Sequence, residues 1–300
     1  MTKLRRNHES QRSAAGGMIA RVGIFSLLAG GLFWIFNQFG GSEPAGSPAV
    51  ETDPTSFEEN FLPSSSTGEV IHHTYYSLSY SEAHEQAEWV AYELSKKDLL
   101  VPNVERTGDF RPDPRVRKAS ASTRDYSGSG YDRGHLAPAG DMAFSREAMS
   151  ESFYMSNMSP QIRNFNGGAW RELEETVRDW TYEFGRLYVI TGPVLSRGIR
   201  EKIGDNGVSV PDEYFKVILD AESEVPKAIA YLLPNEIIQL PLHDYALSVD
   251  EVEEITGLDF FNDLFPDKLE EQLESTYRVN QWPVKENRFK RRLEEWNRRR

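Results

Sequence analysis

The pattern of hydrophobic and polar residues begins with a long apolar segment close to the N-terminus. Residues 22–39 contain no charged side chain, and a helix of this length would span about 27 Å, close to the thickness of a bilayer core. Residues 1–21 are basic, which predicts a cytoplasmic N-terminus and an exported remainder. We therefore expect a transmembrane anchor at residues 22–39. A cleaved signal peptide is the alternative.

The polar stretch that follows separates this segment from the rest of the chain. Residues 40–68 are rich in Gly, Ser and Pro, a composition that is typical of a flexible linker. We expect one folded domain at residues 69–284. Residues 285–300 form a basic tail, for which either a charged helix or a disordered arm is expected.

Within residues 69–284 the apolar positions predict both helices and strands. Apolar residues recur every three to four positions in two segments that we expect to be helical, and Ser145 is a suitable N-cap for a third helix. Other segments are short β-prone runs. This mixture predicts an α+β domain. The expected helices are 81–96, 169–184 and one beginning at 146; the expected strands lie within 70–80, 187–191, 214–219 and 228–233.

Charge is distributed unevenly, and this changes what the net charge implies. A formal charge of −13 argues against a nucleic-acid partner, because phosphate backbones attract basic surfaces. However, residues 201–280 hold 19 Asp and Glu against 5 Lys and Arg, whereas residues 101–135 hold 7 Lys and Arg against 5 Asp and Glu. The acidity belongs to one part of the chain, so a nucleic-acid site remains open elsewhere. The absence of cysteine excludes disulfides, thiolate zinc sites and cysteine nucleophiles.

The run from Tyr131 to Pro138, YDRGHLAP, contains the first candidate chemistry. Arg133 and His135 are two residues apart, so in extended backbone they point to the same face. Histidine is suited to be a general base near neutral pH, and arginine binds phosphate in a bidentate manner. A surface turn with a solvated histidine is the alternative for so short a run.

A second block of motifs makes the run more specific. It reads SNMSPQ at residues 156–161, NFNGGAW at 164–170 and ELEETVR at 172–178. Together with the first run it resembles the DNA/RNA non-specific endonuclease family, of the ββα-metal (His-metal finger) type. The resemblance covers residues 70–267. It implies a central, mostly antiparallel sheet that is flanked by helices.

The resemblance also implies the roles of individual residues. His135 corresponds to the general base, and Asn166 to the side chain that binds Mg²⁺ directly, with Mn²⁺ as an alternative ion. Glu174 corresponds to a catalytic carboxylate that holds the ion through water. Asn157 corresponds to an active-site asparagine.

Three arginines are implied to bind the substrate. Arg133 is the arginine of the first motif and is also implied in catalysis. Arg178 corresponds to a phosphate-contacting arginine, and Arg106 to a looser match upstream.

Spacing within the second block constrains this assignment. Glu174 and Arg178 are i and i+4, so they would be neighbours on a helix and are expected to pair. Asn166 precedes Glu174 by eight residues, about 12 Å along an ideal helix. This supports Glu174 acting through water, or Asn166 lying in the turn before the helix. Asn166 could also be only a helix cap.

The implied function is Mg²⁺-dependent hydrolysis of DNA and RNA to products with 5′-phosphate ends. The expected partners are DNA, RNA, the membrane through the N-terminal helix and, as a possible assembly, a homodimer. Such a protein would be membrane-anchored with its catalytic domain in the periplasm or outside the cell. The alternative is a catalytically decayed nucleic-acid-binding or uptake protein of the cell envelope.

Overall fold

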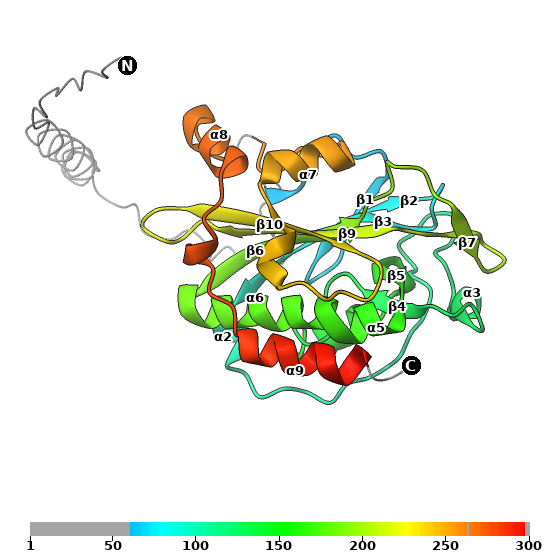
Figure 1. Ribbon diagram of the computed structural model, residues 1–300. Coiled ribbons are helices and arrows are strands. Elements are labelled where there is room, and N and C mark those ends of the chain that lie inside the picture. Colours follow the sequence, from blue (N-terminus) through cyan, green and yellow to red (C-terminus); the bar gives the residue numbers. More distant parts are fainter. Residues whose placement is uncertain (1–60, 263, 298–300) are drawn as a thin grey trace, which may run out of the picture. The chain divides into compact units, whose positions relative to one another are not determined.

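A seven-stranded antiparallel sheet separates two layers of helices in the computed structural model, which describes residues 61–262 and 264–297 (Figure 1). The strand order is β1-β2-β3-β6-β9-β10-β11. These strands are β1 (Glu69–His72), β2 (Ser77–Ser81), β3 (Gln86–Ser95), β6 (Arg186–Pro193), β9 (Glu213–Asp220), β10 (Lys227–Pro234) and β11 (Ala246–Leu247). Two short ribbons pair β4 (Asp132–His135) with β5 (Met158–Gln161) and β7 (Glu201–Ile203) with β8 (Val208–Val210).

The helices cover both faces of the sheet. In Figure 1, α6 and α9 lie on one side of it, and α7 and α8 lie on the other. The helices are α2 (Lys96–Leu99), α3 (Thr123–Tyr126), α4 (Arg146–Glu151), α5 (Arg163–Phe165), α6 (Arg171–Phe184), α7 (Val249–Thr256), α8 (Asp267–Ser275) and α9 (Glu286–Asn297). Short helical turns are η2 (Met155–Asn157), η3 (Asn166–Trp170, a π-helical turn), η4 (Leu242–Tyr245) and η5 (Val279–Gln281).

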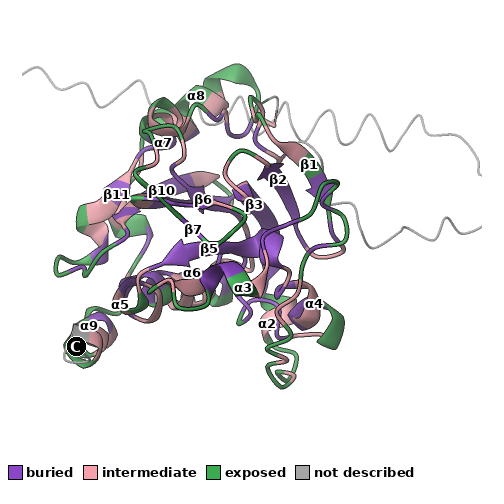
Figure 2. Cartoon of the chain, turned by 90° about the vertical axis from the view of Figure 1, so that its right-hand side faces the viewer, coloured by how far each residue is buried: buried purple, intermediate pink, exposed green. Residues whose placement is uncertain are grey.

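Burial on both faces explains the composition of the central strands. In β9, Tyr214 and Ile218 belong to the core beneath α6, whereas Phe215 and Val217 belong to the core beneath α7. Because neither face meets water, the strand carries apolar residues on both faces. Figure 2 shows the same strands as buried throughout most of their length.

Most of the predicted elements are confirmed. The α+β class and the antiparallel sheet are present, and the helix expected at residues 169–184 is α6, preceded by the turn η3. Ser145 caps α4, since its hydroxyl accepts a hydrogen bond of 3.0 Å from the Ala148 N–H. The β-prone runs became β1 and β2, β6, β9 and β10.

The helix predicted at residues 81–96 is wrong, because most of this segment is the strand β3. Its apolar residues are spaced as in a helix, but they belong to both cores: Val90 and Leu94 face one, and Trp89 and Ala91 face the other. A strand that is buried on both sides carries apolar residues nearly everywhere, so a helical subset occurs within it by chance.

The folded part begins before Glu69, the boundary expected from composition. Phe61 is buried, and its ring stacks on Tyr188 with centroids 3.7 Å apart. Ser64 pairs with Asp259 through its backbone and its hydroxyl. Residues 61–68 therefore pack on the domain. The predicted anchor at residues 22–39 lies outside the described residues, and within the described ones no helix is long and apolar enough to span a membrane.

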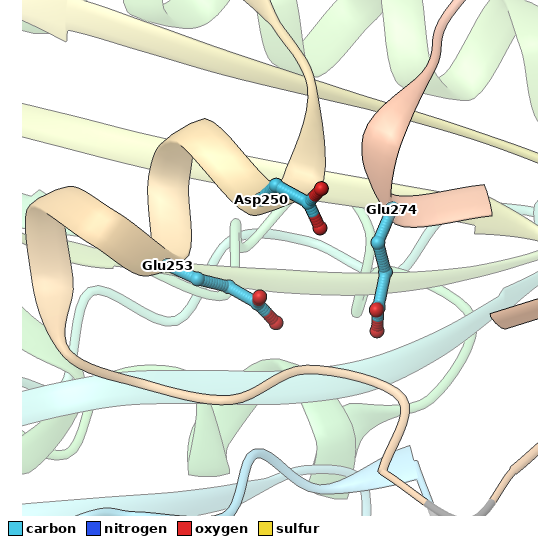
Figure 3. A group of neighbouring side chains, drawn as sticks. All are labelled: Asp250, Glu253 and Glu274. Carbon is cyan, nitrogen blue, oxygen red and sulfur yellow. The ribbon is translucent and has the colours of Figure 1, made fainter. Parts of the chain in front are cut away.

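Three acidic side chains face one another between α7 and α8 (Figure 3). Asp250 and Glu253 come from α7 and Glu274 from α8, and their nearest carboxylate oxygens lie within 4.8 Å of one another. Burial, reinforced by repulsion between the carboxylates, raises the pKa of Glu253 to about 7 and that of Glu274 to about 8. The folded protein therefore keeps protons that the unfolded chain releases.

We expect this cluster to make the fold less stable at alkaline pH. Because the folded pKa values are raised, the contribution to stability is complete below about pH 4.5 and is lost as the pH rises through 7 to 8. At pH 8.5, Glu274→Gln should therefore unfold at a higher urea concentration than the wild type. Its free energy of unfolding should be larger by roughly 1 kcal/mol after allowance for solvent screening. The control is Glu183→Gln, which changes an exposed carboxylate of α6, away from this cluster. Equal gains for both variants would contradict the prediction.

Candidate active site

The ribbon of β4 and β5 positions the first motif. Arg133 pairs with Pro160, and His135 pairs with Met158. Gly134 lies between them against Gln161, where a Cβ would come within 2.1 Å of the Gln161 Oε1 atom. A glycine here therefore leaves room for the buried Gln161 side chain against β4. As predicted, Arg133 and His135 point into the same cavity.

Asn157 fixes the chain that leaves β4. Its Nδ2 group donates to the carbonyl oxygens of Ala137 and Ser152, at 2.9 and 2.8 Å, and its Oδ1 accepts from the Ala137 N–H at 2.8 Å. The side chain is fully buried. All three bonds reach backbone groups, so the amide acts on the loop rather than on the cavity.

His135 lies in an aromatic enclosure. Its ring meets Phe153 edge to face at a centroid distance of 4.9 Å, and Phe110 at 5.8 Å. The Nε2 atom is buried without a hydrogen-bond partner among the described residues. Burial, reinforced by Arg106 and Arg133, lowers the pKa of His135 to about 3. The imidazole is therefore neutral at physiological pH, as a general base must be.

Asn166 lies in η3, the turn before α6, and does not cap that helix. Its Nδ2 group donates to Asp132 Oδ2 at 3.1 Å. This bond fixes which way the amide faces and leaves the Oδ1 atom to bind a ligand. Asp132 therefore orients the Asn166 amide.

Glu174 and Arg178 lie on α6, but the salt bridge predicted between them is not formed. Arg178 pairs instead with Asp141, which also accepts a hydrogen bond of 2.7 Å from the Tyr92 hydroxyl. Asp141 is fully buried, and an unpaired charge at this position would destabilise the fold. The Arg178 guanidinium therefore pairs with Asp141 rather than with Glu174. No hydrogen bond or salt bridge joins Glu174 to another described residue. Burial raises the pKa of Glu174, opposed by the charges of Arg178 and Lys216.

A cavity of about 480 Å³ joins these groups. Among the predicted residues Asn157 does not line it, whereas the other six do: Arg106, Arg133, His135, Asn166, Glu174 and Arg178. The structure adds Arg171 and Trp296, which the sequence analysis did not select. Arg171 was recognisable as a cation within the second motif block, whereas no signal pointed to Trp296.

Two of the cavity arginines rest on aromatic rings. The Arg106 guanidinium lies 4.7 Å from the centroid of Phe153, and that of Arg133 lies 4.1 Å from Phe110. Neither forms a salt bridge within the described part of the chain. Cation–π contacts hold a guanidinium in place without neutralising it, so both charges remain available to an anion.

Lys216 is a buried cation that the sequence analysis missed. It lies on β9, fully buried, with its Nζ atom 4.9 Å from the centroid of the Trp170 ring. Within the described residues the Nζ atom has no hydrogen-bond partner. Burial lowers the pKa of Lys216, opposed by the charges of Glu174 and Asp141. The lysine therefore contributes positive potential beneath Glu174.

Residues 286–297 of the basic tail form the helix α9, which is docked on α6. Arg288 contacts Glu172 and Asp179, each at 2.6 Å, and Arg292 contacts Glu172 at 2.7 Å and also Glu175. The sequence left open a charged helix or a disordered arm for this tail, and residues 286–297 form the helix. Arg288 and Arg292 therefore bind the protein itself and fix α9 beside the cavity.

The chain is similar to several nucleases. It is 37% identical over 243 residues to the mitochondrial nuclease EXOG of Xenopus laevis, covering 75% of this chain and 67% of that protein. It is 35% identical over 198 residues to human mitochondrial endonuclease G, covering 62% and 67%. The chain thus spans about two thirds of the length of these relatives.

A solved structure shows the same fold. The crystal structure of the EndoG/EndoGI complex superposes with a TM-score of 0.63 at 32% identity, covering 68% of this chain and 89% of that one. The model of the DNA/RNA non-specific endonuclease family matches residues 53–267, which include all the predicted cavity residues. The resemblance seen in the motifs is confirmed, and the chain belongs to the DNA/RNA non-specific endonuclease family.

Proposed function

We propose that the protein is a Mg²⁺-dependent endonuclease that hydrolyses DNA and RNA without sequence specificity. The observation that carries this proposal is one cavity that combines a neutral histidine, un-neutralised arginines and two oxygen ligands, from Asn166 and Glu174. These groups address phosphate rather than the edges of bases, which is consistent with low sequence specificity.

Asn166 and Glu174 fit a hard divalent cation. The Asn166 Oδ1 atom is oriented by the bond to Asp132, and Glu174 has no protein hydrogen bond within the described residues. Oxygen ligands of this kind suit Mg²⁺, which keeps several waters, and also Mn²⁺. The bound cation would offset negative charge on the phosphate and on the leaving 3′ oxygen.

His135 is the general base in this proposal. Because Nε2 is buried, Nδ1 is the ring atom left to take a proton from a water molecule in the cavity. The water oxygen bonds to phosphorus, the bond from phosphorus to the 3′ oxygen breaks, and that oxygen takes a proton from solvent. The products carry 5′-phosphate and 3′-hydroxyl ends. Arg106 and Arg133 hold the phosphate, and Asn157 positions the loop behind His135.

Digestion of plasmid DNA and of RNA by the full chain in Mg²⁺ tests this function. We expect His135→Ala to lose about 100-fold or more in rate, the loss typical of a removed general base. We expect Asn166→Ala to lose rate because it removes a proposed cation ligand, and EDTA to abolish cleavage. His243→Ala is the matched control, since that histidine bonds to the Trp282 carbonyl outside the cavity. No cleavage by the wild type would refute the function and favour a decayed nucleic-acid-binding protein. Full cleavage by His135→Ala would refute the mechanism.

The neutral state of His135 should be visible as a dependence of stability on pH. Its folded pKa lies below the ordinary value of 6.5, so in acid the unfolded chain binds a proton that the folded protein does not. Above pH 6.5 His135 does not lower the free energy of unfolding. Between pH 6.5 and pH 3 it lowers that free energy by up to about 1.4 kcal/mol per pH unit as the pH falls. In urea unfolding between pH 8 and pH 4.5, His135→Gln should lose less stability than the wild type. Parallel losses would show that the buried imidazole does not resist protonation.

We further propose that residues 22–39 anchor the protein in a membrane, with the nuclease domain on the exported side. The supporting observations are the uncharged run and the basic residues before it. After cell fractionation, the full chain should stay in the membrane pellet in high salt and carbonate. A variant with both Leu28→Glu and Leu32→Glu should move to the soluble fraction. Recovery of the wild-type chain in the soluble fraction would refute the proposed membrane anchor.

A further inference from the structure

Trp296 of α9 lies in the wall of the candidate active site. The indole ring rests on Gly167, where a Cβ would come within 2.2 Å of the Trp296 Cη2 atom. Gly167 directly follows Asn166, the proposed cation ligand. The backbone carbonyl of Trp296 also accepts a hydrogen bond of 3.0 Å from Asn164 Nδ2. The tryptophan is therefore fixed beside the atoms proposed to cleave the substrate.

The ring connects two adjoining hollows. Trp296 and Arg171 line both the cavity that contains His135 and a second hollow of about 470 Å³, whose other walls include Arg291. The arginines Arg288 and Arg292 of α9 are occupied by carboxylates of α6 and fix the helix in place. Arg291 forms no salt bridge within the described part of the chain, and its side chain is exposed.

An aromatic ring between positive charges matches a nucleic-acid strand. Such a strand offers alternating phosphates and flat bases, and proteins bind it by pairing cationic grooves with aromatic stacking platforms. Arg171 shares its charge with Glu175, whose carboxylate lies 3.1 Å from the Arg171 Nε atom, and Glu295 also lines the second hollow. The phosphate beyond the scissile one would therefore lie near Arg291, which leaves the intervening base opposite the indole.

We propose that Trp296 positions the substrate by stacking on the base next to the scissile phosphate, which makes α9 a part of the nucleic-acid site. This inference rests on the proposed nuclease function. It assigns a substrate contact to a helix that lies beyond residues 53–267, the part of the chain that the family model matches.

The test measures binding separately from cleavage. All variants are made in the full chain with His135→Ala and are studied in Mg²⁺ by fluorescence anisotropy. One labelled ligand is a twelve-residue thymidine oligonucleotide, and the other has the same length and charge but abasic sugars throughout. The side-chain series is Trp296, Trp296→Phe, Trp296→Leu and Trp296→Ala.

We expect Trp296→Leu and Trp296→Ala to raise Kd for the thymidine oligonucleotide about tenfold, the loss typical of one base–aromatic stack. Trp296→Phe should remain within about threefold of tryptophan. For the abasic oligonucleotide all four proteins should bind alike, because no base is present to stack. Trp296→Leu keeps an apolar contact with Gly167. If Trp296→Ala loosens α9, the Kd of Trp296→Leu is therefore the value to compare with that of tryptophan.

Two results would overturn the inference: unchanged binding by Trp296→Leu, or an equal loss of binding on both oligonucleotides. The latter would mean that the indole only supports the helix. Failure of the nuclease proposal is recognised separately, since it requires that the protein with His135 intact cleaves neither DNA nor RNA.

Discussion

The geometry of the active site depends on the side-chain amide of Asn157. Its three hydrogen bonds join the loop after His135 to the turn between α4 and η2, and all three replace water that the buried backbone groups would otherwise need. Without them, the Ala137 N–H and two carbonyl groups would be buried without partners, at a cost of about 1–3 kcal/mol for each group. His135 and Arg133 reach the cavity together because this clamp holds one end of the β4–β5 ribbon, while the close contact of Gly134 with Gln161 holds its middle.

Electrostatics in the cavity follow from what each charged group packs against. Arg178 is paired with Asp141, and Arg288 and Arg292 of α9 are paired with carboxylates of α6, whereas Arg106 and Arg133 pack on phenylalanine rings. An acidic chain therefore maintains a locally positive site. The net charge of −13 describes the whole chain and not the surface that meets a phosphate.

Sequence motifs were sufficient to select His135, Asn166 and Glu174 as residues that line one cavity, since each lies in a short run whose spacing is set by one ribbon or one helix. They were not sufficient where contacts cross the fold. Arg178 pairs with Asp141, which is 37 residues away, and not with the neighbouring Glu174. Trp296 and Lys216 reach the region of the site from elements that are distant in the sequence. The strand β3 was mistaken for a helix because burial on two faces removes the alternation that distinguishes a strand. The local arrangement of these residues was thus predictable, but long-range pairing and two-sided burial were not.

The aromatic support of Arg106 and Arg133 has a consequence for how the enzyme behaves as its reaction proceeds. Guanidinium groups without carboxylate partners attract any small phosphate, whether or not it is joined to a cleavable chain. Inorganic phosphate and the short phosphate-bearing fragments left by digestion would therefore compete with intact strands for the same two charges. The arrangement that keeps the site ready for substrate also makes it sensitive to its own products, so the rate should slow as digestion nears completion and in phosphate-rich surroundings.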